Sequence, residues 1–365
     1  MYPRVTIDLR KFRRNIEIVK EKLDQKGIEI FAVSKVFSGN PMIAKEFEWA
    51  GIKSIGESRM ENPKKIQGLD MQKVLLRLPM QSEIQDLIEY ADISLNSEIS
   101  TLELISEAAL RRGFVHEVIL MVDFGDLREG FFKREALYAA VERCQTLDGV
   151  KVIGVGTNLT CFGAVIPTID HMNQLVEIKQ EIKRRFDLDV KYISGGNSSS
   201  YYLLDDENFP PEINNLRIGE IFVCGNETAY SSQVPGTYDD VFKLEAEIIE
   251  LKDKPSLPIG EPGVDAFGRK PVYEDQGEMV RAICAVGRQD VGIDGLKLVD
   301  EGIEILGSSS DHMILNLTHA SKIYKVGDTI QFKLKYGGIL NVMTSEYINK
   351  VYINSADDSD EVHLR

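Results

Sequence analysis

Short β-branched runs alternate with segments of helical apolar spacing from residue 30 to about residue 220, and this alternation restricts the fold more than any other feature. The intervening segments, such as 133–147 and 165–186, carry apolar residues at the i, i+3, i+4 spacing of amphipathic helices. Eight alternating units favour an α/β fold of the (β/α)8 TIM-barrel type, with a doubly wound open sheet as the alternative. The eight predicted strands are 30–35, 53–57, 73–78, 91–96, 117–123, 151–158, 189–194 and 214–217.

The pattern changes after about residue 236. From there, segments such as VFKLEAEIIELK and DTIQFKLK alternate polar and apolar residues at period two, and Gly, Asp and Pro turns separate them. We therefore expect a barrel over residues 1–235 and a C-terminal antiparallel β domain over residues 236–365. The boundary is expected within the turn-rich stretch 231–240.

The charge balance argues against an anionic macromolecular partner. The chain has 43 Lys and Arg against 58 Asp and Glu, a net charge of −15, which repels nucleic acid and anionic membranes. No stretch approaches the roughly 18 apolar residues of a membrane span, and the N-terminus lacks the apolar core of a signal peptide. We therefore expect a small-molecule substrate, no nucleic-acid or membrane partner, and a cytoplasmic location.

The four cysteines show no metal-binding spacing. Cys144, Cys161, Cys224 and Cys284 form no CxxC pair, and no His-rich segment accompanies them. Reduced thiols are therefore expected, without a structural zinc site or any other metal.

Polar or reactive residues follow the predicted strands. Because the active site of a (β/α)8 barrel lies at the carboxyl ends of its strands, these side chains are expected to gather there. The residues that end the runs are Lys35, Glu57, Arg77, Asn96, Asp123, Asn158, Asn197 and Arg217.

Three of these strand ends indicate a specific coenzyme. Lys35 follows FAVS directly. A lysine at the floor of a crowded pocket has a lowered pKa and can attack an aldehyde. A lone lysine is more often an exposed loop residue. The runs GGNSSS and RIGE offer backbone N–H groups and hydroxyls at helix starts, which favour a phosphate. A lysine and a phosphate site together suggest pyridoxal 5′-phosphate (PLP).

Several longer motifs carry a family resemblance. AVSKVFSGNP, MVDFGDLREG, SGGNSSSYYL and ILGSSSDHMI resemble the alanine racemase superfamily, PLP enzymes that have a barrel and a C-terminal β domain. The resemblance covers nearly the whole chain. It implies a PLP-dependent amino-acid racemase, with ornithine as the first substrate and lysine, arginine or alanine as alternatives.

The resemblance also implies roles for individual residues. Lys35 matches the lysine that holds the coenzyme and serves as one catalytic base. Arg217 matches the arginine that faces the pyridine nitrogen, where a guanidinium that keeps its proton leaves that nitrogen unprotonated and favours racemisation over transamination. Arg128 matches an arginine that supports the lysine side and the substrate carboxylate. The remaining matches are Asn158, Asn197, Ser198, Ile218 and Gly219 for the coenzyme, and Ser310 and Asp311 for the substrate, in a loop that the β domain presents to the partner subunit's pocket.

A second acid/base group must lie opposite Lys35, because racemisation moves protons on both faces of a planar carbon. Alanine racemases use a tyrosine of the β domain, but Phe267 stands at the matching position and cannot carry a proton. A histidine that supports that tyrosine is replaced by Asn158. Asp265, two residues before Phe267, is our first candidate, although an aspartate here is also an ordinary turn former. Behind it come His312, Tyr273 and Cys161, each with an ordinary structural interpretation.

A cationic substrate side chain would bind carboxylates near the pocket mouth, and Asp126 with Glu129, or Glu220 with Glu227, could supply them.

A barrel pocket and a remote β domain complete one site most simply in a head-to-tail homodimer with shared active sites.

Three other functions compete with racemisation by PLP. A non-catalytic PLP-homeostasis carrier shares the AVSK and GESRMEN stretches, but such proteins lack a β domain. A PLP aldolase or dehydratase with a metal would want clustered ligands, whereas only His312 and His319 lie in the middle of the β domain. A cofactor-independent racemase with paired thiols would need neither Lys35 nor a phosphate site.

Overall fold

The computed structural model describes residues 1–264, 267, 268, 270, 272–354, 362 and 363, and the chain divides into two compact units. One unit is Phe12–Asp239, and the other combines Met1–Lys11 with Asp240–Arg365.

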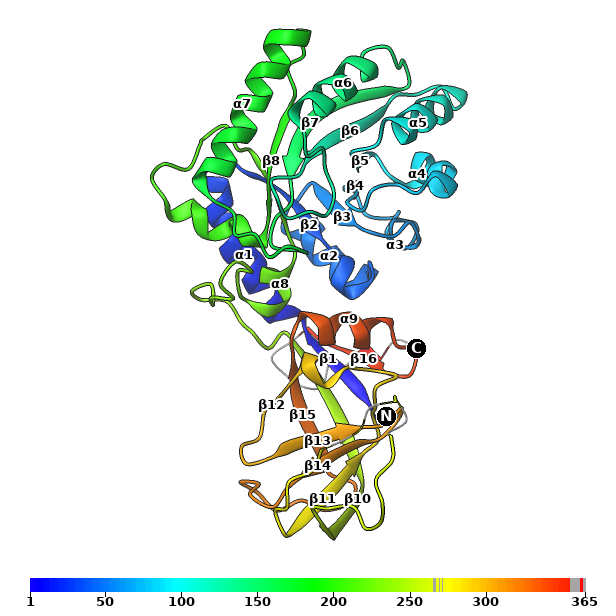
Figure 1. Cartoon of the computed structure of the whole chain (residues 1–365), viewed down its shortest axis with the longest axis vertical. Helices are drawn as coiled ribbons and strands as arrows, with labels where there is room; N and C mark the ends of the chain where they lie inside the picture. Colours follow the sequence, from blue (N-terminus) through cyan, green and yellow to red (C-terminus); the bar gives the residue numbers. More distant parts are fainter. Residues whose placement is uncertain (265–266, 269, 271, 355–361, 364–365) are drawn as a thin grey trace. The chain divides into compact units, whose positions relative to one another are not determined.

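The first unit is a closed parallel barrel of eight strands, as predicted (Figure 1). Each strand pairs with the next along the chain, and the last, β9, pairs with the first, β2. The strands are β2 (Glu29–Val33), β3 (Ser54–Glu57), β4 (Gln72–Leu75), β5 (Ile93–Asn96), β6 (His116–Val122), β7 (Val150–Thr157), β8 (Tyr192–Asn197) and β9 (Asn215–Ile218).

Helices alternate with these strands and surround the barrel (Figure 1). Residues next to a helix can determine where it begins. Asn40 accepts hydrogen bonds from Met42 N and Ile43 N, 3.1 and 3.4 Å away, and caps the helix that begins at Pro41. The α-helices are α1 (Leu9–Gln25), α2 (Pro41–Trp49), α3 (Glu61–Lys65), α4 (Ile84–Tyr90), α5 (Ile99–Arg111), α6 (Arg134–Cys144), α7 (Ile169–Phe186) and α8 (Glu220–Cys224), and the 3-10 helices are η1 (Lys35–Phe37), η2 (Gln81–Glu83) and η3 (Ser198–Asp205).

The inside of the barrel is filled by large side chains. The rings of Phe31 and Tyr192 meet edge to face, with centroids 5.2 Å apart. This cluster fills the inside of the barrel and forms a floor beneath the carboxyl ends of the strands, where barrels of this kind bind their ligands. The cluster consists of Phe31, Val74, Ile93, Leu95, Ile119, Met121, Ile153 and Tyr192.

The second unit is a β domain built on one sheet, and its described strand pairs are antiparallel except that between β1 and β16. Its period-two sequence pattern therefore predicts the sheet correctly. Its elements are β1 (Arg4–Asp8), β10 (Phe242–Pro255), β11 (Glu278–Cys284), η4 (Ile293–Gly295), β12 (Leu296–Leu298), β13 (Glu304–Ser308), β14 (Met313–Asn316), β15 (Thr329–Leu334), α9 (Tyr336–Thr344), β16 (Asn349–Ile353) and β17 (Val362–His363).

The N-terminal segment belongs to the β domain, which differs from the expected division at residues 235 and 236. Strand β1 pairs in parallel with β16 and antiparallel with β10, so residues 1–11 join the sheet formed by the C-terminal part. On the other side, the structure places the division between Asp239 and Asp240. Backbone pairing, which connects segments more than 200 residues apart, is the physical reason for this difference.

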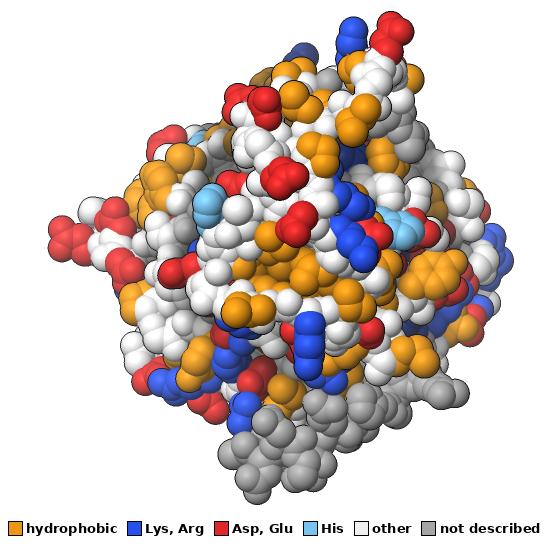
Figure 2. All heavy atoms as spheres, turned by 90° about the horizontal axis from the view of Figure 1, so that it is seen from below, with side chains coloured by type: hydrophobic (Ala, Val, Ile, Leu, Met, Phe, Trp, Pro, Cys, Tyr) orange, Lys and Arg blue, Asp and Glu red, His pale blue; other side chains and the backbone are white. Residues whose placement is uncertain are grey.

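Figure 2 shows the molecule from below, with acidic and basic side chains interspersed around apolar ones. Among the described side chains on this face, no area of a single charge sign is offered to a polyanion. Among the described residues, no helix is long and apolar enough to cross a membrane.

Candidate active site

Lys35 lies at the carboxyl end of β2, at the start of η1. The turn that carries it is fixed by the backbone of Ser34, whose N–H donates to the Gly56 carbonyl over 3.1 Å. The Ser34 carbonyl accepts hydrogen bonds from Phe37 N and Gly39 N, at 3.1 and 3.3 Å. Lys35 itself is half-buried, and these backbone hydrogen bonds anchor the turn that carries it.

Glu57 supports this turn from the neighbouring strand β3. Its carboxylate accepts hydrogen bonds from the Ser34 hydroxyl and from Asn62 Nδ2, the latter 2.8 Å away. Burial raises the pKa of Glu57 above its ordinary value, because these hydrogen bonds only partly compensate for the loss of water. Glu57 is therefore a buried anchor and not a side chain open to substrate.

Arg217 lies on β9, the strand that pairs with β2, and Phe31 of β2 is its register partner. The side chain is buried, with 3% of its surface exposed. Its guanidinium donates to the Thr157 carbonyl and the Ser194 hydroxyl and lies 3.5 Å from Asn158 Oδ1. Burial lowers the pKa of Arg217 to about 10, so the group still keeps its proton at neutral pH.

The loops after β8 and β9 are joined at the predicted phosphate position. Gly219 N donates to Ser198 Oγ over 3.3 Å. Ser199 Oγ is buried and has no hydrogen-bond partner among the described residues. A Cβ added at Gly219 would lie 3.0 Å from the Cβ of Val33, so the chain at this position approaches β2 closely because glycine stands there.

Asn158 and Asn197 connect the ends of β7 and β8. Asn197 Nδ2 lies 3.0 Å from Asn158 Oδ1, 2.9 Å from the Leu159 carbonyl and 3.4 Å from Cys161 Sγ. The Asn197 carbonyl oxygen Oδ1 accepts from Ser199 N over 2.8 Å. The side chain of Asn197 thus positions the surrounding loops, while Asn158 Nδ2 is buried and finds no acceptor within the described part of the chain.

Asp126 fixes the loop after β7. Its carboxylate accepts hydrogen bonds from the backbone N–H groups of Cys161, Phe162 and Val165, at 3.2, 2.9 and 3.2 Å. Burial alone would raise the pKa of Asp126, but these backbone hydrogen bonds outweigh it and hold the pKa below the ordinary value. Asp126 is thus engaged by the backbone, contrary to the hypothesis that it binds a cationic substrate group.

Glu227 is engaged in the same way, by the N–H groups of Ala229, Tyr230 and Ser232. Burial raises the pKa of Glu220, while a hydrogen bond with Asn226 and the charge of Lys35 oppose that shift.

Arg128 and Glu129 form an ion pair in the loop after β6. Burial would lower the pKa of Arg128, but the carboxylate of Glu129 outweighs it and raises that pKa. Arg128 also interacts electrostatically with Cys161. This pair brings the arginine predicted for the substrate carboxylate and one of the predicted acidic residues to the same place.

The other predicted residues belong to the β domain. His312 Nδ1 lies 2.8 Å from Asp311 Oδ1 on an exposed turn, and the Ser310 carbonyl accepts a hydrogen bond from Gln289 N over 2.9 Å. The guanidinium of Arg288 lies over the ring of Phe267, with Cζ 4.4 Å from the ring centroid. The further candidates are Tyr273, whose side chain is exposed, and Asp265, which lies outside the described residues.

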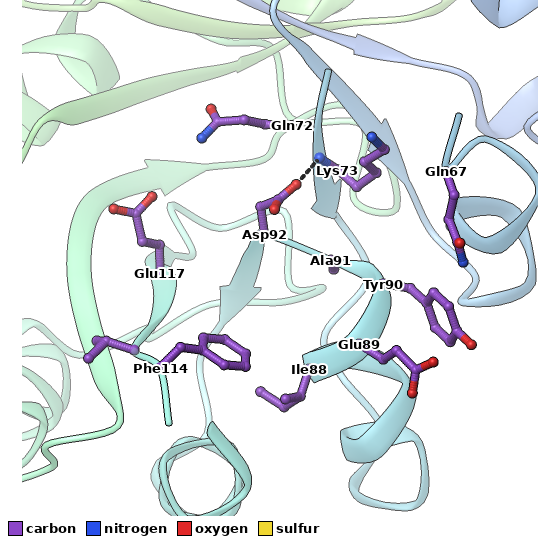
Figure 3. A pocket seen from close by; sticks show the side chains of 11 residues that line it. Gln67, Gln72, Lys73, Ile88, Glu89, Tyr90, Ala91, Asp92, Phe114 and Glu117 are labelled. Carbon is purple, nitrogen blue, oxygen red and sulfur yellow. Dashed lines mark hydrogen bonds between the residues drawn. The ribbon is translucent and has the colours of Figure 1, made fainter. Parts of the chain in front are cut away.

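A hollow of about 550 Å³ lies at the opposite, amino end of the strands (Figure 3). Lys73 N donates to Asp92 Oδ2 over 2.7 Å on its wall, and Glu117 and Phe114 also line it. These residues lie at or just before the starts of β4, β5 and β6, the end of a barrel that serves stability and not chemistry. We therefore place the active site at the carboxyl ends. Within the described part of the chain, no group of three His, Cys, Asp or Glu side chains could hold a metal ion.

The family described as alanine racemase, N-terminal domain, matches residues 7–226. The chain belongs to the alanine racemase family. An ornithine racemase from Acetoanaerobium sticklandii is 47% identical to it over 350 residues, which cover 96% of this chain and 99% of the relative. A lysine racemase from Thermotoga maritima is 38% identical over 354 residues, with the same coverage.

Solved structures of the alanine racemase family share the fold. The alanine racemase from Bartonella henselae, which carries covalently bound pyridoxal phosphate, matches with a TM-score of 0.73 at 17% identity, over 97% of this chain and 100% of that one. The predictions of the alanine racemase superfamily, of a barrel followed by a β domain, and of an amino-acid racemase as the class of enzyme are confirmed by these matches.

Sequence reasoning missed the serines that support the site. Ser34 and Ser194 are both buried. Ser34 directly precedes Lys35, Ser194 accepts a hydrogen bond from Arg217, and both serines follow short apolar or aromatic runs, in FAVS and YIS. A serine at the end of an apolar run could have indicated them. A buried hydroxyl needs a hydrogen-bond partner, so such a serine is expected to contact another polar side chain inside the barrel.

Proposed function

We propose that this protein is a PLP-dependent racemase that interconverts the enantiomers of ornithine. The observation that carries the proposal is the placement of Lys35 and Arg217 at the ends of two paired strands, with Phe31 opposite Arg217 in the register. The amine needed for an aldehyde and a buried, protonated guanidinium thus lie at neighbouring strand ends. The 47% identity to an ornithine racemase supports ornithine over lysine, arginine and alanine.

The residues at this end of the barrel fit the coenzyme. Two buried polar groups, Ser199 Oγ and Asn158 Nδ2, lack partners among the described residues and suit the acceptor oxygens of a phosphorylated ligand. Gly219 leaves the backbone close to β2 without a side chain in the way. The residues proposed to hold PLP are Lys35, Asn158, Asn197, Ser198, Arg217, Ile218 and Gly219.

When bound, PLP stabilises the negative charge that develops at Cα after the substrate loses its proton. Lys35 Nζ then moves a proton at one face of Cα. Arg217 keeps its own proton at neutral pH and can only donate, so a ring nitrogen placed against it stays unprotonated. Arg128 orients the substrate carboxylate by a charge-assisted hydrogen bond, in competition with Glu129.

The β domain is proposed to serve the barrel of a second subunit in a head-to-tail homodimer. In that arrangement, Ser310 and Asp311 contact the substrate, and His312 and Asp265 are acid/base candidates. A cytoplasmic location belongs to the same proposal. The β domain, Asp240–Arg365 together with Met1–Lys11, disfavours the carrier alternative, because single-domain PLP carriers have no such unit.

Borohydride reduction of the purified holoprotein followed by peptide mapping tests the coenzyme link. We expect the added mass on Lys35, its loss in Lys35→Ala, and its retention in Lys45→Ala, which removes an exposed lysine of α2. Racemisation assays from each enantiomer of ornithine, lysine, arginine and alanine should give the highest kcat/KM for ornithine. An unmodified Lys35, or inversion of none of these amino acids, contradicts the proposal.

A further inference from the structure

Proton transfer at two faces of Cα needs two acid/base residues. Among the described residues at the carboxyl ends of the strands, several acidic side chains are already engaged by other groups and are therefore poor candidates for the second one. Asp126 is bound by three backbone N–H groups, and Glu57 is buried against Ser34 and Asn62. Glu129 pairs with Arg128. Cys161, by contrast, carries an exposed thiol on the loop after β7.

A continuous set of contacts connects this thiol to the coenzyme side of the barrel. Asn197 Nδ2 lies 3.4 Å from Cys161 Sγ and 3.0 Å from Asn158 Oδ1, and Arg217 Nη2 lies 3.5 Å from the same Asn158 oxygen. The sulfur therefore belongs to the same cluster as the buried guanidinium. Cys161 was expected to pack as a small core residue if it had no function, and the structure places it at the surface instead.

The surroundings of Cys161 are cationic. The guanidinium groups of Arg128 and Arg217 both interact electrostatically with Cys161.

A second observation indicates that a ligand completes this cluster. Asn158 is only 8% exposed, and its Nδ2 has no acceptor among the described residues. The other end of the same amide already accepts from Asn197 and Arg217. An acceptor atom of a bound molecule would satisfy Nδ2 next to the Cys161 loop.

The loop that carries Cys161 is held in one conformation. Asp126 Oδ2 accepts from Cys161 N over 3.2 Å, and the Asp126 carbonyl accepts from Gly163 N over 3.0 Å. Around the closed barrel, β7 is separated from β2 by β8 and β9, so the residues after these strands reach the barrel axis from different sides. Lys35 and Cys161 therefore approach a ligand on the axis from different directions.

We propose that Cys161 is the second acid/base residue of the racemase, which moves the Cα proton on the face opposite Lys35. In one direction the Cys161 thiolate accepts the proton from Cα while the ammonium of Lys35 delivers one to the other face, and in the reverse direction the two exchange roles. Proton exchange with water resets both groups, and no oxidant is needed. The inference rests on the proposed function and replaces Asp265 as the first candidate.

Solvent-deuterium exchange at Cα, measured from each enantiomer of ornithine, tests the role of Cys161. In Cys161→Ala we expect racemisation to fall by about 100-fold or more, because a positioned general acid/base contributes on that order. Exchange without inversion should continue from the one enantiomer whose proton Lys35 removes. The coenzyme absorbance should stay unchanged. Cys144→Ala, which removes a buried thiol of α6, should racemise like the wild type.

Thiol alkylation of the wild-type protein gives a readout that does not depend on turnover or on how a variant folds. Burial raises the pKa of Cys144 to about 11 and of Cys284 to about 12, so these thiols serve as unreactive internal references. Iodoacetamide should modify Cys161 at least about tenfold faster than either reference, and saturating ornithine should protect Cys161.

The outcomes separate this inference from the proposed function. Racemisation by Cys161→Ala within threefold of the wild type, loss of exchange from both enantiomers, or a Cys161 that ornithine does not protect would overturn the inference. Retained one-sided exchange in Asp265→Asn, with normal inversion by Cys161→Ala, would assign the role to Asp265. Failure of the wild type to bind PLP or to exchange any Cα proton would overturn the proposed function itself.

Discussion

The hydroxyl of Ser34 donates a hydrogen bond to the carboxylate of Glu57, which ties the residue before Lys35 to the end of the neighbouring strand β3. Asn62 donates to the other carboxylate oxygen over 2.8 Å, and all three side chains are buried. The position of the lysine turn thus depends on a side chain that does not face the substrate.

Glu57→Ala should destabilise the protein and loosen this turn. Removing the carboxylate leaves the buried donors of Ser34 and Asn62 unpaired, which costs about 1–3 kcal/mol for such groups. Urea denaturation should show this loss, and borohydride trapping should show slower attachment of PLP to Lys35. Glu61→Ala, which removes an exposed carboxylate at the start of α3, is the matched control. Equal stability and equal attachment rates in the two variants would contradict the anchoring role.

Asp126→Asn should release the Cys161 loop. An amide in place of the carboxylate loses the negative charge that three backbone N–H groups share, so we expect hydrogen exchange at Cys161, Phe162 and Val165 to quicken about 10- to 100-fold. Because the pKa of Asp126 lies below its ordinary value, its stabilising effect is present at neutral pH and is lost as the pH falls through the lowered value. Asp148→Asn, at an exposed position, should leave these amides unchanged.

The barrel was predictable because each of its strands can be recognised from a short segment of the sequence. Each of the eight apolar runs is long enough to be recognised alone, and the observed strands overlap all of them. Strand β1 was missed for the opposite reason. The pairing of Arg4 with Asn349 and Glu245 involves partners at the far end of the chain, and no periodicity within RVTID reveals them.

The positions of two proposed site residues were predictable from the strands. Lys35 and Arg217 end apolar runs, so the barrel rule alone placed them at the carboxyl ends of the strands. The backbone contacts of Asp126 were not predictable, because the sequence around a carboxylate does not show which N–H groups it will bind. Those groups belong to a loop 35 or more residues later.

Arg217→Met should retain or increase stability while it abolishes racemisation. The folded-state pKa of about 10 lies below the ordinary 12.5, so burial of the charged guanidinium destabilises the fold by roughly 3 kcal/mol at all pH values below 10. The penalty fades as the pH rises from 10 to 12.5. In the variant, Ser194 still donates to Asn215 and Asn158 still accepts from Asn197.

The comparison for this variant is Arg111→Met on the exposed face of α5. Thermal unfolding of both proteins, with racemase activity measured on the same samples, separates the two effects. A strongly destabilised Arg217→Met would show that the guanidinium holds the fold and is not maintained for the chemistry.

His116 should make the protein sensitive to mild acid. It is buried at the start of β6, where Nε2 lies 3.0 Å from Ser94 Oγ, and burial lowers its pKa to about 4. The unfolded chain takes up a proton near pH 6.5, whereas the folded protein does so only near pH 4. Stability is therefore complete above pH 6.5 and falls as the pH drops from 6.5 to 4, by roughly 3 kcal/mol in total and about 2 kcal/mol of it by pH 5.

His116→Gln removes this titration and keeps a hydrogen-bonding group for Ser94. Urea midpoints measured between pH 7.5 and pH 5 should therefore fall less in His116→Gln than in the wild type, even if the variant is less stable at pH 7.5. His319→Gln, at an exposed position of the β domain, is the control variant and should behave like the wild type. An identical pH dependence in all three proteins would contradict this prediction. It would mean that burial does not lower the pKa of His116 in the folded protein and is not the source of the acid sensitivity.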